Sequence, residues 1–190
     1  MHIELTDHLR CPEPHDEAFL VLIPNAMDGR RVIAGHLGCP VCGWSCDWDD
    51  GVPVFEDVAI PEGSPPFDAE SALAMLGLEG PGGWIALAGT AGALAHELAE
   101  LLPDVAIVAV NPPEGVASAG AVSVIRSPVW PVKRHAMRGV VIGEGVVTVT
   151  DALGSALPGL RVVGQGTRPD LGPGDELVAE ADGVWVIRHR

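Results

Sequence analysis

Basic residues are scarce in this chain, which has 11 Lys and Arg against 26 Asp and Glu and a formal net charge of −15 over 190 residues. Nucleic-acid recognition needs a dense cationic face that meets the phosphates, so this balance argues against nucleic-acid binding. The deficit is uneven, because residues 1–70 hold 14 of the acidic but only 3 of the basic side chains. The asymmetry predicts two regions with different surfaces, of which the acidic N-terminal one could attract a basic protein partner.

Long apolar runs and an export signal are also missing. No stretch approaches the ~20 consecutive apolar residues of a membrane-spanning helix. No basic segment leads into an apolar run at the N-terminus, as it would in a secretory signal. We therefore expect a cytoplasmic protein without membrane contact. Apolar residues still make up 47 % of the chain, which is enough for a real core.

Cysteines number four and all lie in the first quarter of the chain, at Cys11, Cys39, Cys42 and Cys46. In a cytoplasmic protein, such clustering indicates metal or redox chemistry rather than disulfides. The segment 39–43, Cys-Pro-Val-Cys-Gly, is typical of a zinc knuckle, because two thiolates three residues apart reach one ion across a tight turn.

Structural zinc takes four ligands, so a second pair is needed. The segment 11–15, Cys-Pro-Glu-Pro-His, can supply it, and the preferred ligand set is Cys11, His15, Cys39 and Cys42. A competing set replaces His15 with Cys46. Alternatively, Cys46 is a small buried hydrophobic residue, as free Cys commonly is.

Composition and hydrophobic pattern divide the chain into three parts. Residues 1–56 alternate short β-like runs with turns, including a predicted hairpin of 18–23 with 31–37 across a turn at 24–30. Residues 57–68 are acidic and proline-rich and are interpreted as a linker. Residues 69–190 alternate apolar strands with helices predicted at 69–78, 92–102 and 151–157, the last ended by Pro158-Gly159. Continuous apolar strands between helices predict a mostly parallel sheet.

The first part resembles the small zinc-ribbon family of methyltransferase activators over residues 5–55. The resemblance rests on the segments 9–12 (Leu-Arg-Cys-Pro), 37–43 (Leu-Gly-Cys-Pro-Val-Cys-Gly) and 50–55 (Asp-Gly-Val-Pro-Val-Phe). In that family the position of Cys46 is usually an aromatic non-ligand, which supports His15, although the first knuckle here lacks its second Cys. Because the family's ribbon pairs with a methyltransferase domain by strand addition, the resemblance implies a protein partner or self-association through the ribbon.

The last part resembles a class I S-adenosylmethionine-dependent methyltransferase over about residues 68–190. Segment 105–111 is similar to the family's second strand and its terminal residue, 152–160 to the helix and turn before the fifth strand, and 177–188 to the closing strand pair. The two resemblances imply an α/β protein, in which a small β-rich zinc ribbon (1–56) and a linker (57–68) precede a reduced Rossmann-like domain (69–190).

The departures from the methyltransferase pattern fall where the family binds its cofactor. Ala86 stands where an acidic residue begins the glycine motif, Ala88 and Thr90 replace its first two glycines, and only Gly92 matches. At the ribose position the acidic residue is replaced by Asn111, which carries no charge. The resemblance places S-adenosylmethionine, if it binds, on Ala88, Gly89, Gly92 and Asn111. Losing several hydrogen bonds together weakens binding by orders of magnitude.

Catalytic motifs of other classes are missing, since the sequence has no Gly-x-Ser-x-Gly elbow, no phosphate loop and no His-Glu-x-x-His. We assign no catalytic residue. The predicted function is a zinc-stabilised, non-catalytic scaffold or regulatory binding protein with a methyltransferase-like fold, that is, a pseudoenzyme. The alternative is an active methyltransferase of RNA, protein or a small molecule with an atypical cofactor pocket.

One basic cluster stands out in the acidic sequence. It comprises Lys133, Arg134, His135 and Arg138, flanked by Trp130. The cluster could contact a phosphate or an acidic partner, such as the linker of this chain, but the negative total charge favours a solvated loop.

Overall fold

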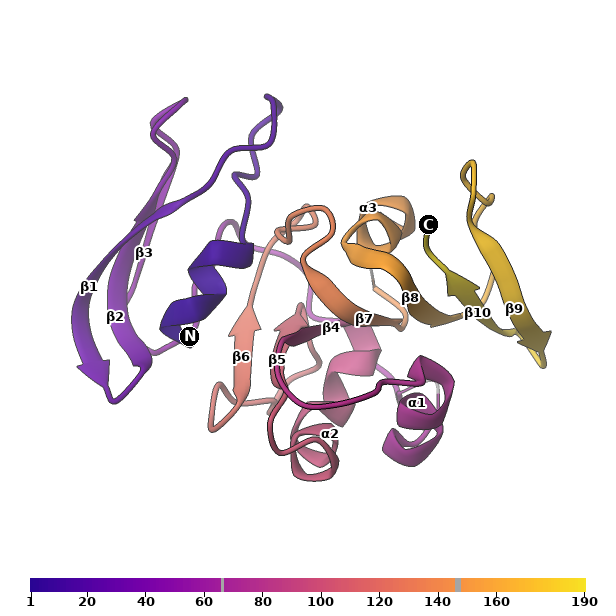
Figure 1. The fold of residues 1–190 in the computed structure, drawn as a ribbon. Coiled ribbons are helices and arrows are strands. Elements are labelled where there is room, and N and C mark those ends of the chain that lie inside the picture. The colour runs from indigo at the N-terminus through magenta and orange to yellow at the C-terminus, as the bar shows by residue number, and fades with distance from the viewer. Residues whose placement is uncertain (66, 146–147) are drawn as a thin grey trace.

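Two β-sheets hold the strands of the chain (Figure 1), whose computed structural model describes residues 1–65, 67–145 and 148–190. The small sheet is antiparallel with the order β1-β2-β3. It follows the 3-10 helix η1 (Ile3–His8) and contains β1 (Val21–Asp28), β2 (Arg31–Gly38) and β3 (Ser45–Trp48).

The large sheet has seven strands in the order β6-β5-β4-β7-β8-β10-β9. The strands are β4 (Trp84–Ala88), β5 (Ala106–Val110), β6 (Val122–Ile125), β7 (Met137–Ile142), β8 (Ala156–Gln165), β9 (Glu176–Ala181) and β10 (Val184–Arg188). The first five in this order are parallel, and β10 runs antiparallel to both of its neighbours. The strand order reverses between β4 and β7, which is where ligands bind in open α/β sheets. The predicted α/β class with a mostly parallel sheet is confirmed.

Both faces of the large sheet are covered. Helices α1 (Ala69–Leu76) and α2 (Ala95–Leu101), preceded by the 3-10 helix η2 (Gly89–Leu94), lie on one face, and α3 (Val149–Gly154) lies on the other (Figure 1). The core on the α3 face also contains the N-terminal region, because Leu5 and Leu37 belong to the same buried cluster as Val108 and Val140. None of the described helices is long and apolar enough to cross a membrane.

Backbone pairing joins the N-terminal region to the loop after β6. The N–H of Phe55 donates to the Arg126 carbonyl at 2.8 Å, and the N–H of Arg126 donates to the Pro53 carbonyl at 3.0 Å. Val54 thereby pairs in parallel with Arg126, and Leu9 pairs antiparallel with Val132. Part of the strand-pairing capacity of the N-terminal region is therefore used within the chain.

The β1–β2 hairpin is longer than the sequence predicted. The expected turn at 24–30 is wrong, because β1 continues through Pro24 to Asp28 and only Gly29 and Arg30 turn the chain. Pro24 is tolerated because β1 is an edge strand, where a missing N–H need not break a ladder. The register shifts between Pro24 and Ala26 accommodate it.

Two helix boundaries also differ from prediction. The helix expected at 92–102 is divided into η2 and α2, so the first turn is a 3-10 turn that begins at Gly89. The helix expected at 151–157 is α3, and Pro158-Gly159 lies inside β8 instead of ending a helix. The Gly159 N–H donates to the His189 carbonyl at 2.6 Å, so pairing with the C-terminal segment overrides the local turn signal.

Candidate metal centre and cofactor crevice

Four side chains from the two predicted knuckles converge in the structure. The ligand atoms of Cys11, His15, Cys39 and Cys42 all lie within 4.8 Å of one another. The Sγ atoms of Cys11 and Cys42 are 3.6 Å apart, and the Cys39 Sγ is 3.5 Å from the His15 Nε2. A zinc tetrahedron with typical Zn–S and Zn–N bonds has edges of about 3.8 and 3.5 Å between such atoms. The cluster could therefore hold zinc as a closed, structural site.

The second knuckle is shaped by its own backbone hydrogen bonds. The N–H of Gly43 donates to the Cys39 carbonyl at 3.0 Å, and the N–H of Cys39 donates to the Trp44 carbonyl at 2.7 Å. Gly43 has φ +79°, a left-handed conformation that glycine adopts without strain. The Trp44 N–H points at the Cys42 Sγ at 3.4 Å. This turn presents both thiols to the same point.

His15 is oriented for coordination through Nε2. Its Nδ1 lies 2.6 Å from the Asp16 carbonyl, which only accepts, so Nδ1 carries the proton. Nε2 faces the thiol of Cys39 and is the nitrogen that is free to coordinate once the ring is neutral. A backbone partner that fixes the ring in this way is typical of metal-binding histidines.

The metal-free cluster holds protons unevenly. Burial raises the pKa of Cys11 to about 12. Burial alone would also raise the pKa of Cys39, but hydrogen bonds from the backbone of Cys42 and Val41 and from the other thiols lower it to about 6. The hydrogen bond with the Asp16 carbonyl raises the pKa of His15 to about 9. Zinc must displace the protons on Cys11 and His15 to bind.

Cys46 lies outside this cluster. It is in β3, opposite Leu37 of β2, and 8 % exposed. Burial raises the pKa of its thiol to about 12. This environment matches the interpretation of Cys46 as a small buried hydrophobic residue.

Three of the four predicted cofactor contacts meet in one cavity. Ala88, Gly89 and Asn111 line it at the carboxyl ends of β4 and β5, together with Val110, Val129, Trp130 and Gly145. The cavity has a volume of about 10 Å³, room for about one water molecule, whereas ligand pockets typically have roughly 300–1,000 Å³. Gly92 packs elsewhere, because a Cβ on it would lie 2.5 Å from the Pro112 Cβ.

Both polar atoms of the Asn111 side-chain amide are hydrogen-bonded to the backbone of one residue, Ser127. Its Nδ2 donates to the Ser127 carbonyl at 2.7 Å, and its Oδ1 accepts from the Ser127 N–H at 2.8 Å. Asn111 is only 2 % exposed and has φ +50°. The side chain predicted to face a ribose therefore ties the end of β5 to the loop after β6.

The loops after β4 and β7 are also joined to each other. The N–H of Gly143 donates to the Ala88 carbonyl at 2.9 Å, and the N–H of Thr90 donates to the Glu144 carbonyl at 2.9 Å. The Glu144 N–H in turn donates to the Thr90 Oγ1 at 3.0 Å. These three bonds close the crevice where the strand order reverses. The sequence contained one sign of this role, a threonine in place of a motif glycine.

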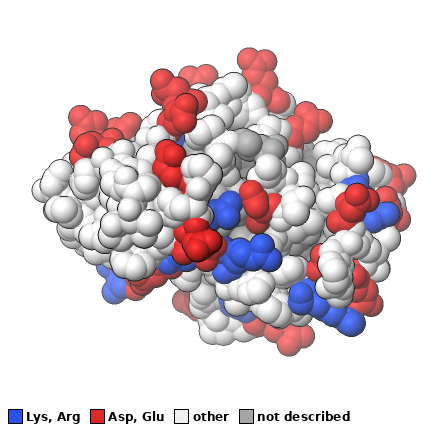
Figure 2. All heavy atoms as spheres, turned by 90° about the horizontal axis from the view of Figure 1, so that it is seen from above, with Lys and Arg blue, Asp and Glu red and all other residues white. Residues whose placement is uncertain are grey.

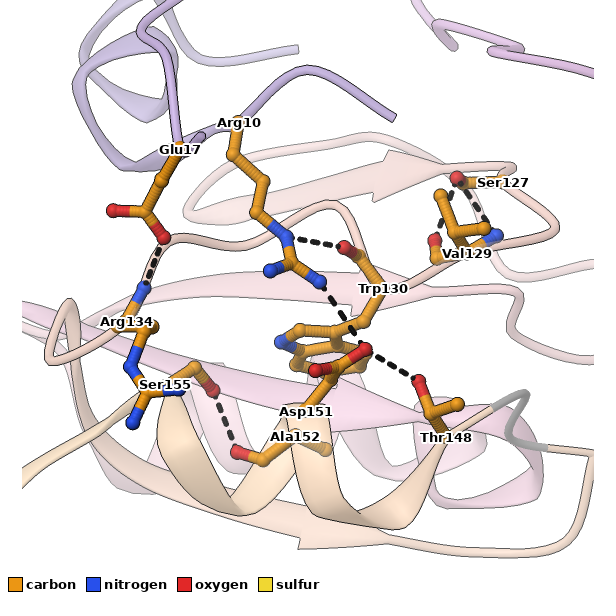
Figure 3. A network of polar contacts seen from close by, with 10 residues as sticks. All are labelled: Arg10, Glu17, Ser127, Val129, Trp130, Arg134, Thr148, Asp151, Ala152 and Ser155. Carbon is orange, nitrogen blue, oxygen red and sulfur yellow. Dashed lines mark hydrogen bonds and ion pairs between the residues drawn. The ribbon is translucent and has the colours of Figure 1, made fainter. Parts of the chain in front are cut away.

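Trp130 lines the cavity and is hydrogen-bonded to Arg10 (Figure 3). Its indole is buried, and its carbonyl accepts from the Arg10 Nε at 3.0 Å. Arg10 also forms an ion pair with Asp151, with 3.2 Å between Nη2 and Oδ2. Because Arg10 directly precedes Cys11, this network connects the Cys/His cluster to the crevice. In the sequence Trp130 stands only beside the basic cluster, and no sequence signal indicates this position.

The tight approach at Gly89 gives a first prediction. A Cβ on Gly89 would lie 1.8 Å from the Glu144 carbonyl oxygen, so we expect Gly89→Ala to destabilise the protein by about 3 kcal/mol or more, from backbone displacement and strain. Gly115→Ala is the matched control, because Gly115 also has positive φ but open space around its Cβ position. It should lose only about 1 kcal/mol. Equal losses in chemical denaturation would contradict the close contact.

Comparisons with known proteins find similarity at the level of structure only. No family model matches the chain, and no curated protein sequence is similar to it. Similar solved structures include a SAM dependent methyltransferase from Aquifex aeolicus, with 14 % identity and a TM-score of 0.46 over 64 % of this chain and 88 % of that chain. A geranyl diphosphate methyltransferase in complex with GPP and sinefungin has 19 % identity and a TM-score of 0.42, over 50 % of this chain and 43 % of that chain.

A third similar structure is a complex between a methyltransferase activator from Haloferax volcanii and a methyltransferase. The identity is 14 % and the TM-score 0.41, over 50 % of this chain and 50 % of that chain. This chain thus spans about half the length or less of two of these three relatives. All three TM-scores are below 0.5, so the fold of this chain rests on its own strand order and strand directions, which form a mostly parallel α/β sheet.

Proposed function

We propose that this protein is a zinc-stabilised, non-catalytic scaffold or regulatory binding protein with a methyltransferase-like fold. The observation that carries the proposal is the crevice at the carboxyl ends of β4 and β5. Its volume is about 10 Å³, and the amide of Asn111 is bound to Ser127. The loops after β4 and β7 are hydrogen-bonded across it. A cofactor would have to break these internal contacts before it could bind.

Zinc in this proposal is structural, held by Cys11, His15, Cys39 and Cys42. The distances between their ligand atoms support it, and four protein ligands leave no open position for a reactive water. The metal would order a ribbon of 1–56 that is too small to be stable alone. A linker at 57–68 would then lead into the Rossmann-like domain of 69–190.

The exposed edge of the small sheet fits a protein partner best. Strand β1 forms one edge of the small sheet. Its residues Val21 and Ile23, and Phe19 just before it, are each at least 45 % exposed. An edge strand with apolar side chains is suited to strand addition by another chain or a second copy. The similar activator complex is consistent with protein partnering.

One observation favours the alternative of an active methyltransferase. Ala88, Gly89 and Asn111 line the same cavity, as residues around a cofactor would. In this alternative the loops open to admit S-adenosylmethionine, and Asn111→Ala weakens its binding.

Calorimetric titration of the zinc-loaded protein with S-adenosylmethionine and S-adenosylhomocysteine tests the proposal. We expect no binding and no rise in melting temperature, because a ligand stabilises only a folded state that binds it. Micromolar binding that Asn111→Ala abolishes would overturn the scaffold and establish the alternative. For the scaffold, Asn111→Ala should change only stability, by about 1–3 kcal/mol, since it leaves the Ser127 backbone unpaired.

A further inference from the structure

A second cleft lies on the α3 face of the large sheet, outside the crevice described above. It has a volume of about 690 Å³, which is within the range of ligand-binding clefts. Its walls come from the segment before β7, from α3, from the loop between β8 and β9 and from the residues after β10. We call it the α3 cleft, and its lining includes Arg134, His135, Leu153, Leu171, His189 and Arg190.

A buried histidine in this lining has one nitrogen without a partner. His189 is 9 % exposed, and its Nδ1 lies 2.9 Å from Oδ1 of Asp175. Asp175 is itself fixed, because its Oδ2 accepts from the Gly172 N–H at 3.0 Å. The carboxylate of Asp175 accepts a hydrogen bond from the Nδ1–H of His189. The other ring nitrogen, Nε2, makes no bond to this carboxylate. Nε2 is buried and has no hydrogen-bond partner among the described residues. An unsatisfied buried polar atom is costly, and a ligand could satisfy it.

Two arginines and two histidines line the same cleft, together with Asp170 and Asp175. The guanidinium of Arg134 lies over the end of α3, with Cζ 3.8 Å from the Cβ position of Gly154. Within the described part of the chain, no carboxylate lies within ion-pair distance of this guanidinium. The imidazole of His135 is centred 5.4 Å from that of His189. Figure 2 shows blue side chains in the middle and at the lower right of this face, among the red ones.

The neighbouring members of the basic cluster are engaged elsewhere. The Lys133 Nζ donates to the Asp7 carbonyl at 3.0 Å. The guanidinium of Arg138 donates to the carbonyls of Gly80 and Pro81, each at 3.1 Å. Of the three Lys and Arg residues of the cluster, Arg134 is therefore the one whose side chain is left for a ligand.

Apolar side chains form the rest of the cleft. Leu153 of α3 is buried, while Leu171 of the β8–β9 loop is 38 % exposed, and Pro169 and Pro173 flank it. Apolar walls with a few convergent polar groups are typical of small-molecule sites. The lining thus fits a molecule with an apolar body and a negative end.

We propose that the α3 cleft binds a small organic oxyanion, a carboxylate or a phosphate ester on an apolar body. The anionic group bonds to the guanidinium of Arg134 and to the Nε2 of His189, and the body packs on Leu153 and Leu171. For this bond Nε2 must carry a proton, and the carboxylate of Asp175 stabilises the resulting imidazolium. The proposal is independent of the cofactor crevice and of the proposed function.

Ligand titrations of the full chain test the proposal, with binding followed by the NMR signals of the histidine rings. Benzoate and phenyl phosphate distinguish the two anion types, and benzyl alcohol is the neutral control. We expect at least one of the two anions to bind and to shift the signals of His189 and His135, while benzyl alcohol binds at least tenfold more weakly. Equal binding of benzyl alcohol, or no shift with either anion, would overturn the proposal.

Variants then locate the site. Arg134→Ala should weaken binding about tenfold or more, the usual value of a charge-assisted hydrogen bond, and it removes only an exposed side chain. His189→Gln should weaken it similarly. Arg168→Ala is the matched control, because Arg168 pairs with Glu180 and does not line the cleft; it should bind like the unmodified protein. If Arg134→Ala binds as tightly as this control, the anion sits elsewhere and the proposal is wrong.

Proton uptake gives an independent readout. The bond to Nε2 of His189 takes up a proton, so benzoate binding should strengthen when the pH is lowered from about 8 to about 6. The charged and titratable residues that line the cleft with His189 are Asp170, Asp175, His135, Arg134 and Arg190. His135→Gln should keep the pH dependence and His189→Gln should remove it. A pH dependence lost only with His135→Gln would assign the proton to the other ring and contradict the proposal.

Discussion

Removal of zinc should unfold the N-terminal region and destabilise the whole chain. A metal present at roughly 1,000 times its dissociation constant contributes about 4 kcal/mol to the folded state, so chelation should lower stability by at least that amount. The effect should extend beyond the knuckles, because Leu5 and Leu37 share a buried cluster with Val108 and Val140 of the large sheet. Thermal unfolding with and without chelator measures the loss, and metal analysis should find about one zinc per chain.

Single substitutions test which side chains hold the metal. Cys11→Ser and His15→Ala should each reduce zinc retention and reproduce much of the effect of the chelator. Cys46→Ala is the matched control, because Cys46 is buried in β3 outside the cluster. It should keep zinc and lose only about 1 kcal/mol, as for a small buried group. Zinc lost with Cys46→Ala and retained with His15→Ala would favour the competing ligand set.

Lowering the pH should weaken zinc binding and thereby destabilise the protein, as chelation does. The pKa values of Cys11 and His15 are raised, to about 12 and about 9, in the metal-free cluster. Each must lose a proton before it can bind zinc. Protons therefore compete increasingly well as the pH falls, and the stability supplied by zinc should fall with them. A zinc affinity that is constant between about pH 8 and pH 5 would contradict thiolate and imidazole ligation.

The large sheet was predictable because its buried strands are continuous apolar runs in the sequence. Residues 84–88 and 106–110 are continuous apolar runs, and each is buried in a parallel strand. The ends of α3 and of the β1–β2 hairpin were not predictable, since Pro158 and Pro24 are turn signals on their own. In both cases pairing with a distant segment decides the structure, and local propensity cannot report such pairing.

The two candidate sites also differ in how far the sequence could predict them. The convergence of Cys39 and Cys42 was predictable from their spacing, whereas the choice between His15 and Cys46 stayed open until the fold placed His15 beside the thiols and Cys46 in β3. The state of the crevice was not, because it depends on partners remote in sequence. Asn111 bonds to Ser127, and Thr90 bonds to Glu144. An asparagine at the position of a ribose ligand indicates weakened cofactor binding, but only the fold shows what the amide binds instead.

The substitution Trp130→Ala should distinguish most clearly between a non-catalytic scaffold and an enzyme whose cofactor pocket is closed by this side chain. Trp130 is 2 % exposed and lines the cavity at Ala88, Gly89 and Asn111. Truncating a buried aromatic residue of this size costs about 3–5 kcal/mol, and it enlarges the cavity in which the alternative proposal places S-adenosylmethionine. For the scaffold we expect lost stability without any binding of S-adenosylmethionine, because the amide of Asn111 and the joined loops after β4 and β7 still close the crevice.

Trp185→Ala is the control, because Trp185 is 1 % exposed and packs on Gly164 of β8, away from the cavity. It should lose a similar amount of stability and should also bind no S-adenosylmethionine. Trp130→Leu keeps apolar bulk and offers a milder variant if Trp130→Ala does not fold. Cofactor binding gained by Trp130→Ala or Trp130→Leu, and not by Trp185→Ala, would make the indole a plug on a functional pocket. In that case the link from Trp130 through Arg10 to Cys11 would connect the metal to the opening of an enzyme, and the scaffold proposal would be wrong.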